Sequence, residues 1–109
     1  MAELNVGGER FHVQRMGPPE TPERPVVVFV HGLVMDNLSS WFFSVANQVA
    51  AGGHPVLLYD LRGHGLSSRP DHGYDVATMV TDLDGLLNAA GIRGPVVLVG
   101  NSYGGLLAL

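Results

Sequence analysis

The 109-residue sequence contains no cysteine, which excludes disulfide bonds, thiol catalysis and thiolate metal sites. Charged residues make up only 15% of the chain, and its net charge of −4 offers no basic surface for nucleic acid or an anionic membrane. No apolar run approaches the roughly 18 residues that a membrane-spanning helix needs. The histidines are scattered, without metal-ligand spacing. We therefore expect no metal, no cofactor, no nucleic-acid partner and no membrane partner.

The composition is that of a globular protein, because 46% of the residues are hydrophobic. The length predicts a single domain over residues 1–109. The first ten residues carry acidic side chains and two glycines, where a secretory signal needs a basic start and an apolar run. The expected location is cytoplasmic.

Apolar patterning predicts alternating strands and helices. Continuous runs rich in β-branched residues predict strands buried on both faces at residues 26–30, 55–59 and 95–99. Two further strands, 2–6 and 9–16, flank Gly7-Gly8, which is a hairpin signal. Helical spacing predicts a first helix that is capped by Ser39 or Ser40 and stopped by Gly52-Gly53, with Phe42, Val45, Ala46, Val49 and Ala50 on its apolar face.

A second helix is expected to begin at Asp75 and to end at Gly91. Its predicted core face comprises Val76, Met79, Val80, Leu83, Leu86, Leu87 and Ala90, and Asp82 and Asp84 are expected on a solvated face. A third helix begins at Tyr103. This order predicts an α/β fold in which an antiparallel hairpin leads into a parallel sheet flanked by helices.

Residues 100–104 form the pattern Gly-x-Ser-x-Gly, with Ser102 at its centre. In a chain with 15 glycines the pattern alone is weak, but an apolar strand runs directly into it and a helix starts directly after it. A serine at such a strand-to-helix turn is held above the sheet, where helix N–H groups favour negative charge on a bound acyl oxygen. The alternative is an ordinary helix N-cap after a glycine turn.

Three motifs resemble the α/β-hydrolase superfamily in order and spacing. They are Val28-Phe29-Val30-His31-Gly32, then the loop of residues 59–67 (Tyr-Asp-Leu-Arg-Gly-His-Gly-Leu-Ser), and Gly100-Asn101-Ser102-Tyr103-Gly104-Gly105. The resemblance covers residues 3–109. It implies that Ser102 is the nucleophile at the turn known as the nucleophile elbow.

The resemblance also implies the surroundings of Ser102. Backbone N–H groups of Leu33, or alternatively Val34, and of Tyr103 would form the oxyanion hole. The substrate would lie against His31, Gly32, Val34 and Met35. The family places its acid and histidine after the nucleophile, so both are expected beyond residue 109.

The end of the chain fits the same expectation, because residues 106–109 are apolar without a helix-ending signal. We expect an N-terminal fragment of one α/β-hydrolase domain, truncated after the elbow. It should be inactive and poorly stable alone.

Other polar residues are expected to serve structure. The resemblance gives His31 a supporting role in the oxyanion loop rather than that of general base, and gives His64 a structural role. Asp60 is expected to bond backbone in its own turn. Glycine-rich segments are a feature of nucleotide-binding loops, but neither phosphate-binding pattern is complete here. Of the aromatic residues 41–43 at least one is expected in the core, while Met35 and Leu38 are pocket candidates.

The expected function is hydrolysis of an ester, thioester or related acyl substrate through an acyl-enzyme at Ser102. Alternatives within the fold are a cofactor-free haloperoxidase, an acyltransferase or a lyase, and outside catalysis a ligand-binding member. Haloalkane dehalogenases and epoxide hydrolases are disfavoured, since these similar proteins carry aspartate at the elbow.

Overall fold

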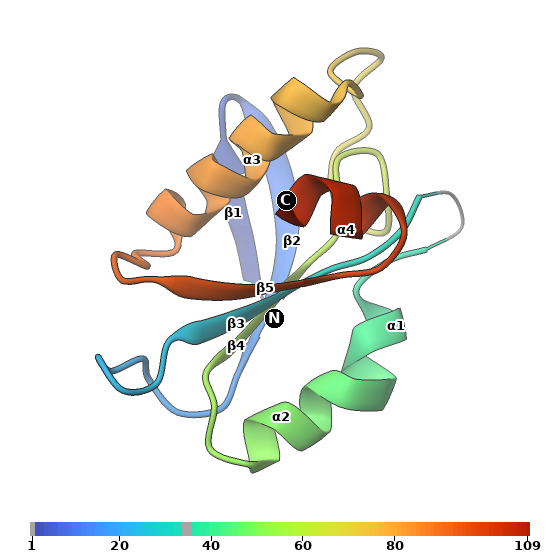
Figure 1. Cartoon of the computed structure of the whole chain (residues 1–109). Coiled ribbons are helices and arrows are strands. Elements are labelled where there is room, and N and C mark those ends of the chain that lie inside the picture. The colour runs from blue at the N-terminus through green and yellow to red at the C-terminus, as the bar shows by residue number, and fades with distance from the viewer. Residues whose placement is uncertain (1, 34–35) are drawn as a thin grey trace.

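The computed structural model describes residues 2–33 and 36–109. Its centre is a five-stranded mixed sheet with the strand order β1-β2-β4-β3-β5 (Figure 1). The strands are β1 (Ala2–Val6), β2 (Glu9–Met16), β3 (Val26–Val30), β4 (Val56–Tyr59) and β5 (Val96–Gly100). The helices are α1 (Ser39–Trp41), the π-helical segment η1 (Phe42–Ala46), α2 (Asn47–Ala51), α3 (Val76–Ala89) and α4 (Tyr103–Ala108).

The pairing of the strands confirms the predicted architecture. Strands β1 and β2 form an antiparallel hairpin whose turn places Gly7 and Gly8 at φ values of 57° and 84°. Strand β2 continues antiparallel to β4, whereas β3 pairs in parallel with both β4 and β5. An antiparallel hairpin therefore leads into a parallel sheet.

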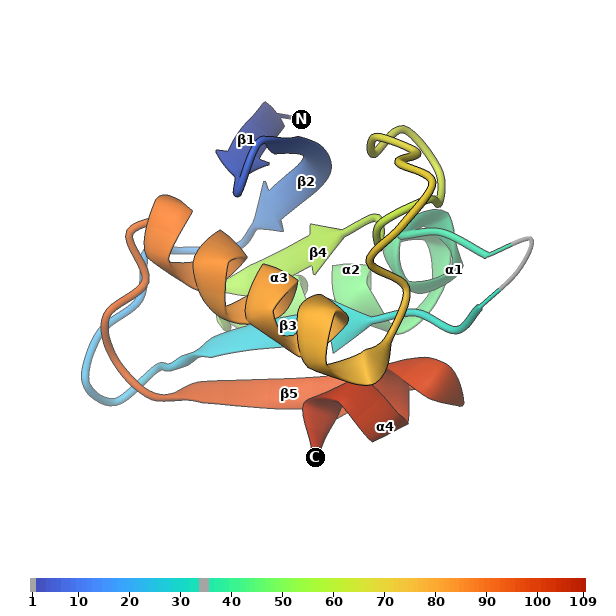
Figure 2. The same cartoon turned by 90° about the horizontal axis from the view of Figure 1, so that it is seen from above.

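Helices cover both faces of this sheet, as Figures 1 and 2 show. Alternate residues of β3 enter two different cores, because successive side chains of a strand point to opposite faces. Val28 packs with residues of α3 and α4, including Leu86 and Leu107. Phe29 packs instead with Leu38 and Ala46 of the α1–η1–α2 segment.

The first predicted helix exists but is not one regular helix. Its middle is π-helical, and Ser44 has the non-helical values φ −127° and ψ −105°. A π-helical stretch has a wider turn than an α-helix. The spacing that placed Val45 on the apolar face therefore fails, and this residue is 47% exposed. The predicted serine cap is also wrong, since the N–H of Ser39 donates to Oδ1 of Asn37 at 2.8 Å.

Helix α3 begins as predicted, but its buried face differs. Oδ2 of Asp75 accepts the N–H of Thr78 at 3.0 Å and caps the helix. Val76 and Val80 are each 40% exposed, contrary to the prediction. Asp82 lies on the buried face instead, because it pairs there with a buried arginine of the β4–α3 loop.

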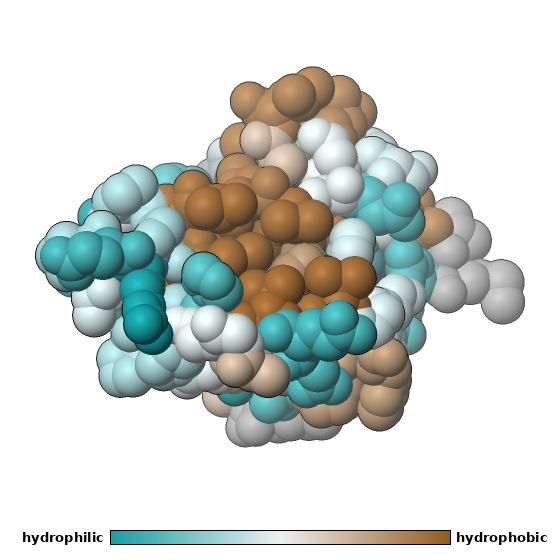
Figure 3. Space-filling view, turned by 60° about the horizontal axis from the view of Figure 1, so that its bottom comes forward, coloured by the Kyte–Doolittle hydropathy of each residue, from teal (hydrophilic) through white to brown (hydrophobic). Residues whose placement is uncertain are grey.

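Strand β5 lies at one edge of the sheet and pairs only with β3 among the described strands. It is therefore less buried than the prediction of a strand covered on both faces, and Val97 is 47% exposed. Leu106 and Leu109 of the neighbouring α4 region are exposed as well. Figure 3 shows a broad hydrophobic area in the middle of one side of the molecule, bordered by hydrophilic residues.

Candidate active site

Three loops gather at one end of the sheet. Strands β3, β4 and β5 are parallel to one another, so the loops that follow them leave from the same edge (Figure 2). These loops carry the three sequence motifs. The parallel order thus brings residues near 31, 60 and 102 into one region.

Ser102 has a backbone conformation that serine rarely adopts. Its φ is 56° and its ψ is −119°, and among the described residues it is the only non-glycine with positive φ. Such a conformation costs about 1–3 kcal/mol and persists only when the surrounding structure enforces it. The side chain is exposed and makes no capping hydrogen bond to α4. This geometry is that of a strained turn and not that of an ordinary N-cap serine.

Two glycines permit this turn by close backbone approach. A Cβ atom on Gly100 would lie 2.3 Å from the carbonyl oxygen of Gly104. A Cβ atom on Gly104 would lie 2.1 Å from the carbonyl oxygen of Val30. Both contacts involve backbone atoms, which cannot move aside as a flexible side chain can. Glycine is thus required at both positions to bring β5, α4 and β3 together.

Two backbone N–H groups near Ser102 are candidates for an oxyanion hole. Tyr103 is the first residue of α4, where an N–H group has no partner within the helix. Gly32, which precedes Leu33, lies against the elbow, since its Cβ position would be 3.6 Å from Cβ of Ser102. Within the described part of the chain, no backbone hydrogen bond engages the N–H of Leu33 or of Tyr103.

His31 is fully buried and braces the loop that contains Gly32. Its Nε2 accepts the N–H of Leu61 at 3.0 Å, and its Nδ1 donates to the carbonyl of Gly32 at 2.6 Å. Burial lowers the pKa of His31, although the hydrogen bond to Gly32 opposes this effect. A neutral ring with both nitrogens engaged joins the loops after β3 and β4. Its contribution to substrate binding would therefore be to hold Gly32 and Leu33 in place.

Asp60 connects three segments through its carboxylate, in agreement with the structural role expected from the sequence. Oδ1 accepts the N–H of Leu38 at 2.8 Å, and Oδ2 accepts the N–H of Leu66 at 2.9 Å. Oδ2 also lies 2.8 Å from Nδ1 of His12 on β2. His64, in the same loop, is half-buried, with Nδ1 2.9 Å from the carbonyl of Arg62. The Asp60 loop is thereby tied to β2 and to the start of the α1 region.

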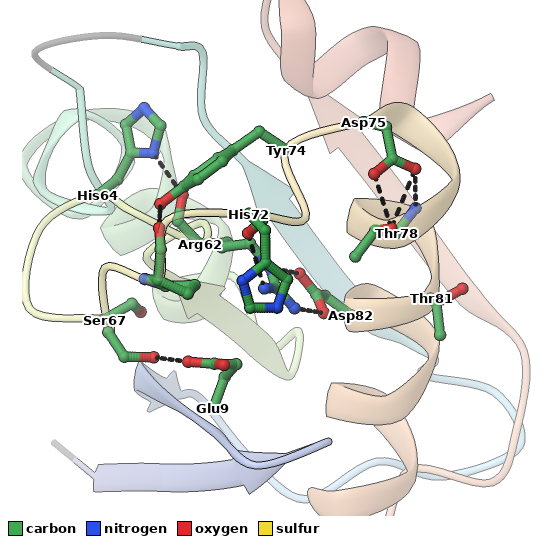
Figure 4. A network of polar contacts seen from close by, with 12 residues as sticks. Glu9, Arg62, His64, Ser67, His72, Tyr74, Asp75, Thr78, Thr81 and Asp82 are labelled. Carbon is green, nitrogen blue, oxygen red and sulfur yellow. Dashed lines mark hydrogen bonds and ion pairs between the residues drawn. The ribbon is translucent and has the colours of Figure 1, made fainter.

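The prediction of a solvated helix face for Asp82 is wrong, whereas Asp84 is exposed as expected. Asp82 accepts two hydrogen bonds from the guanidinium of Arg62, at 2.9 and 3.0 Å, and both side chains are buried (Figure 4). The hydrogen bond to Asp82 raises the pKa of Arg62. Arg62 also donates to the carbonyl of His72 at 3.2 Å. This ion pair fixes the β4–α3 loop against α3.

Replacing Asp82 by asparagine should lower the free energy of unfolding by about 3 kcal/mol or more, because Arg62 would keep a buried and uncompensated charge. Urea denaturation of the natural full-length protein measures this loss. Asp84→Asn on the exposed face of α3 is the matched control and should change stability by no more than about 0.5 kcal/mol. Equal effects of the two substitutions would contradict a structural role for the ion pair.

The remaining pocket candidates divide between core and surface. Leu38 is buried in the core beneath the sheet, and Trp41 and Phe42 pack against that core. Phe43 is 79% exposed. The core role expected for at least one of these aromatic residues is confirmed. Val34 and Met35, predicted to contact substrate, lie outside the described residues.

Sequence reasoning missed Asp36, which organises the loop beside Ser102. Its Oδ2 accepts the N–H of Gly32 at 2.9 Å, its Oδ1 accepts the N–H of Asn37 at 2.9 Å, and Ser40 donates its hydroxyl to Oδ1. Burial alone would raise the pKa of Asp36, but these three hydrogen bonds outweigh it and lower the pKa below its ordinary value. The signal for Asp36 in the sequence is the polar run before the first helix, in which the predicted caps are the serines alone.

Within residues 2–33 and 36–109, no group of three histidine, aspartate or glutamate side chains is placed to hold a metal ion. No helix in the same ranges is long and apolar enough to cross a membrane. The residues around Ser102 offer backbone N–H groups and the carboxylate of Asp36, which is held by hydrogen bonds. The backbone N–H groups suit the stabilisation of negative charge on a bound substrate.

A model of the family described as alpha/beta hydrolase fold matches residues 25–109. The chain belongs to the α/β-hydrolase family. Epoxide hydrolase A of Mycobacterium tuberculosis is 35% identical over 106 residues, which are 95% of this chain and 31% of that protein. The non-heme chloroperoxidase of Streptomyces lividans is 37% identical over 84 residues, which are 72% of this chain and 28% of that protein.

Solved α/β-hydrolase structures give the same assignment. The crystal structure of the enol-lactonase from Burkholderia xenovorans superposes with a TM-score of 0.85 at 28% identity, over 97% of this chain and 39% of the enol-lactonase. The chain thus spans about a third of the length of the α/β-hydrolases that it matches. Relatives with hydrolase names support an enzyme of this superfamily. The names of the relatives indicate different reactions, since they include an epoxide hydrolase, a chloroperoxidase and an enol-lactonase.

Proposed function

We propose that the protein is a hydrolase of esters, thioesters or related acyl compounds, with Ser102 as the nucleophile. Ser102 attacks the carbonyl carbon and forms a tetrahedral intermediate, which expels the alcohol or thiol and leaves an acyl-enzyme. Water then attacks the acyl-enzyme, releases the carboxylic acid and restores the Ser102 hydroxyl. A histidine after the nucleophile in chain order, implied by the family resemblance, would take the serine proton.

The backbone conformation of Ser102 is the observation that carries this proposal. The positive φ of Ser102 is energetically unfavourable, and no capping hydrogen bond from its side chain to α4 offsets this strain. Active sites are where such strain is retained. The exposed hydroxyl is thereby available to a bound substrate.

The N–H groups of Leu33 and Tyr103 support the same chemistry. The negative charge of a tetrahedral intermediate needs donors that are in place before the reaction. The loop from Gly32 is held against Ser102 by His31 and Asp36, and Tyr103 follows the nucleophile directly. We assign the two N–H groups to the oxyanion hole, with Gly32, Val34 and Met35 beside the bound acyl group.

The identity of the nucleophile favours acyl substrates over epoxides, despite the relatives named epoxide hydrolases. A carboxylate that opens an epoxide forms an ester, and water can cleave that ester at its carbonyl carbon. A serine that opened an epoxide would form an alkyl ether, which has no carbonyl for water to attack. Ser102 therefore fits an acyl-enzyme cycle and would be trapped by an epoxide.

Rapid mixing of the natural full-length protein with a p-nitrophenyl ester tests this proposal. We expect a burst of p-nitrophenolate of about one equivalent per protein molecule, followed by slower steady turnover, when deacylation limits the rate. A terminal epoxide should give no turnover. Hydrolysis of the epoxide with no reaction of any ester or thioester would contradict the proposal, and binding without reaction would favour a ligand-binding member of the family.

A second candidate, perhydrolysis, is favoured by the chloroperoxidase relative. Hydrogen peroxide would replace water as the attacker of the acyl-enzyme, giving a peracid and the free serine hydroxyl. The two candidates share Ser102 and differ only in the second step. Adding peroxide during steady-state ester turnover separates them, because peracid forms only in the second case.

A further inference from the structure

A carboxylate lies close to the proposed nucleophile. A Cβ atom on Gly32 would be 3.4 Å from Oδ2 of Asp36 and 3.6 Å from Cβ of Ser102. Because both distances start from the same Cβ position, Oδ2 of Asp36 and Cβ of Ser102 are no more than about 7 Å apart. Oδ2 also accepts the N–H of Gly32, which fixes the carboxylate beside the proposed oxyanion loop.

This carboxylate carries a negative charge that its neighbours preserve. Three hydrogen bonds, from Ser40 and from the N–H groups of Asn37 and Gly32, keep the pKa of Asp36 below its ordinary value despite partial burial. None of the ion pairs among the described residues includes Asp36. The nearby imidazole ring of His31 is neutral, because burial lowers the pKa of that histidine.

The two buried acidic side chains of this region, Asp60 and Asp82, have partners of their own. Asp60 pairs with His12, and Asp82 pairs with Arg62. Asp36 is therefore a fixed and unpaired negative charge beside Ser102 in the described part of the chain. A charge so placed acts on any charged group of a bound substrate through Coulomb's law.

We propose that Asp36 determines specificity by charge, so that Ser102 acts on acyl compounds that are neutral or cationic near the reacting carbonyl and rejects anionic ones. This inference rests on the proposed function of Ser102. A substrate carboxylate a few ångströms from the carbonyl would be repelled, and a cationic group at the same place would be attracted. With the screening typical of a partly exposed site, we expect an effect of about tenfold on kcat/KM.

The repulsion between Asp36 and the oxyanion does not affect a comparison of kcat/KM between two esters. Asp36 disfavours the negative charge of every tetrahedral intermediate by the same amount, whichever ester is bound. The ratio of kcat/KM between two esters cancels that common contribution. A merely structural role of Asp36 in bracing Gly32 cancels in the same way.

The experiment compares three p-nitrophenyl esters of similar length on the natural full-length protein at low ionic strength. They are the neutral butyrate, the anionic succinate monoester and the cationic 4-(trimethylammonio)butyrate. The native protein should prefer the neutral and cationic esters to the anionic one. Asp36→Asn should reduce the neutral-to-anionic ratio about tenfold. Asp84→Asn, which makes the same change of net charge on the exposed face of α3, should leave the ratio unchanged.

Two further variants keep the outcome decisive. Ser40→Ala removes one hydrogen bond to Asp36 but keeps its charge, so it should leave the ratio unchanged. Ser102→Ala tests the underlying function, because loss of all turnover supports the nucleophile whatever the ratio is. Equal losses for all three esters in Asp36→Asn would overturn the charge selection alone. If Asp36→Asn does not fold, a native preference for the anionic ester overturns it as well.

Discussion

Replacing Gly104 by alanine should lower the free energy of unfolding by about 3 kcal/mol or more and abolish activity. The added Cβ would lie 2.1 Å from the carbonyl oxygen of Val30 and 2.5 Å from that of His31. Both atoms belong to the backbone at the end of β3, where the sheet is buried. Relief of the overlap would push α4 away from β3 and would move Ser102 with it.

The adjacent Gly105→Ala is a matched control in the same helix. Its nearest contact, with the carbonyl oxygen of Gly100, is an ordinary 3.5 Å. Alanine has the higher helix propensity, so this substitution should be neutral or should stabilise by up to about 1 kcal/mol. Chemical denaturation of the two variants of the natural full-length protein measures the difference. Equal stability would mean that the close approach of α4 to β3 does not constrain this position.

Substitutions of Ser102 should separate chemistry from backbone strain. Ser102→Ala should lower kcat by at least about 10⁴-fold, because the attacking oxygen is lost. The alanine would still occupy φ 56° and ψ −119°. Ser102→Gly should be equally inactive, yet more stable than the alanine variant by about 1 kcal/mol or more, since glycine adopts positive φ without a side-chain clash.

Thermal unfolding of the two variants, together with ester turnover, checks this pair of expectations. A glycine variant no more stable than the alanine variant would contradict the strain at position 102. Activity that survives in either variant would show that another group attacks the substrate. The two readouts are independent, so each part of the prediction can fail alone.

The sheet was the part of the fold most accessible from the sequence. Strands β3, β4 and β5 are short apolar runs, and Gly7-Gly8 marks the hairpin, so their places could be assigned from local patterns. The cap at Asp75 was equally local, because its side chain bonds a residue three positions away. Periodicity was less reliable for the helices, since a π-helical turn changes which side chains face the sheet.

The parts that escaped prediction depend on partners distant in the sequence. Asp82 has the spacing of a solvated residue, and only its contact with Arg62, twenty positions earlier, explains its burial. Asp36 is closer in sequence to its hydrogen-bond partners. Its proposed role depends, however, on the proximity of Gly32 to Ser102, which belongs to a different loop at the same edge of the sheet. Helical spacing carries no information about such contacts. The glycine pattern around Ser102 was informative because it reflects backbone approach directly.

Covalent labelling of the natural full-length protein with a fluorophosphonate tests the central claim most directly. The probe phosphonylates an activated serine and so reports nucleophilicity without reference to any substrate. We expect one adduct per molecule, located by peptide mass spectrometry at Ser102, and no labelling of Ser102→Ala. An adduct at another residue, or labelling that persists in Ser102→Ala, would contradict the assignment of Ser102 as the nucleophile.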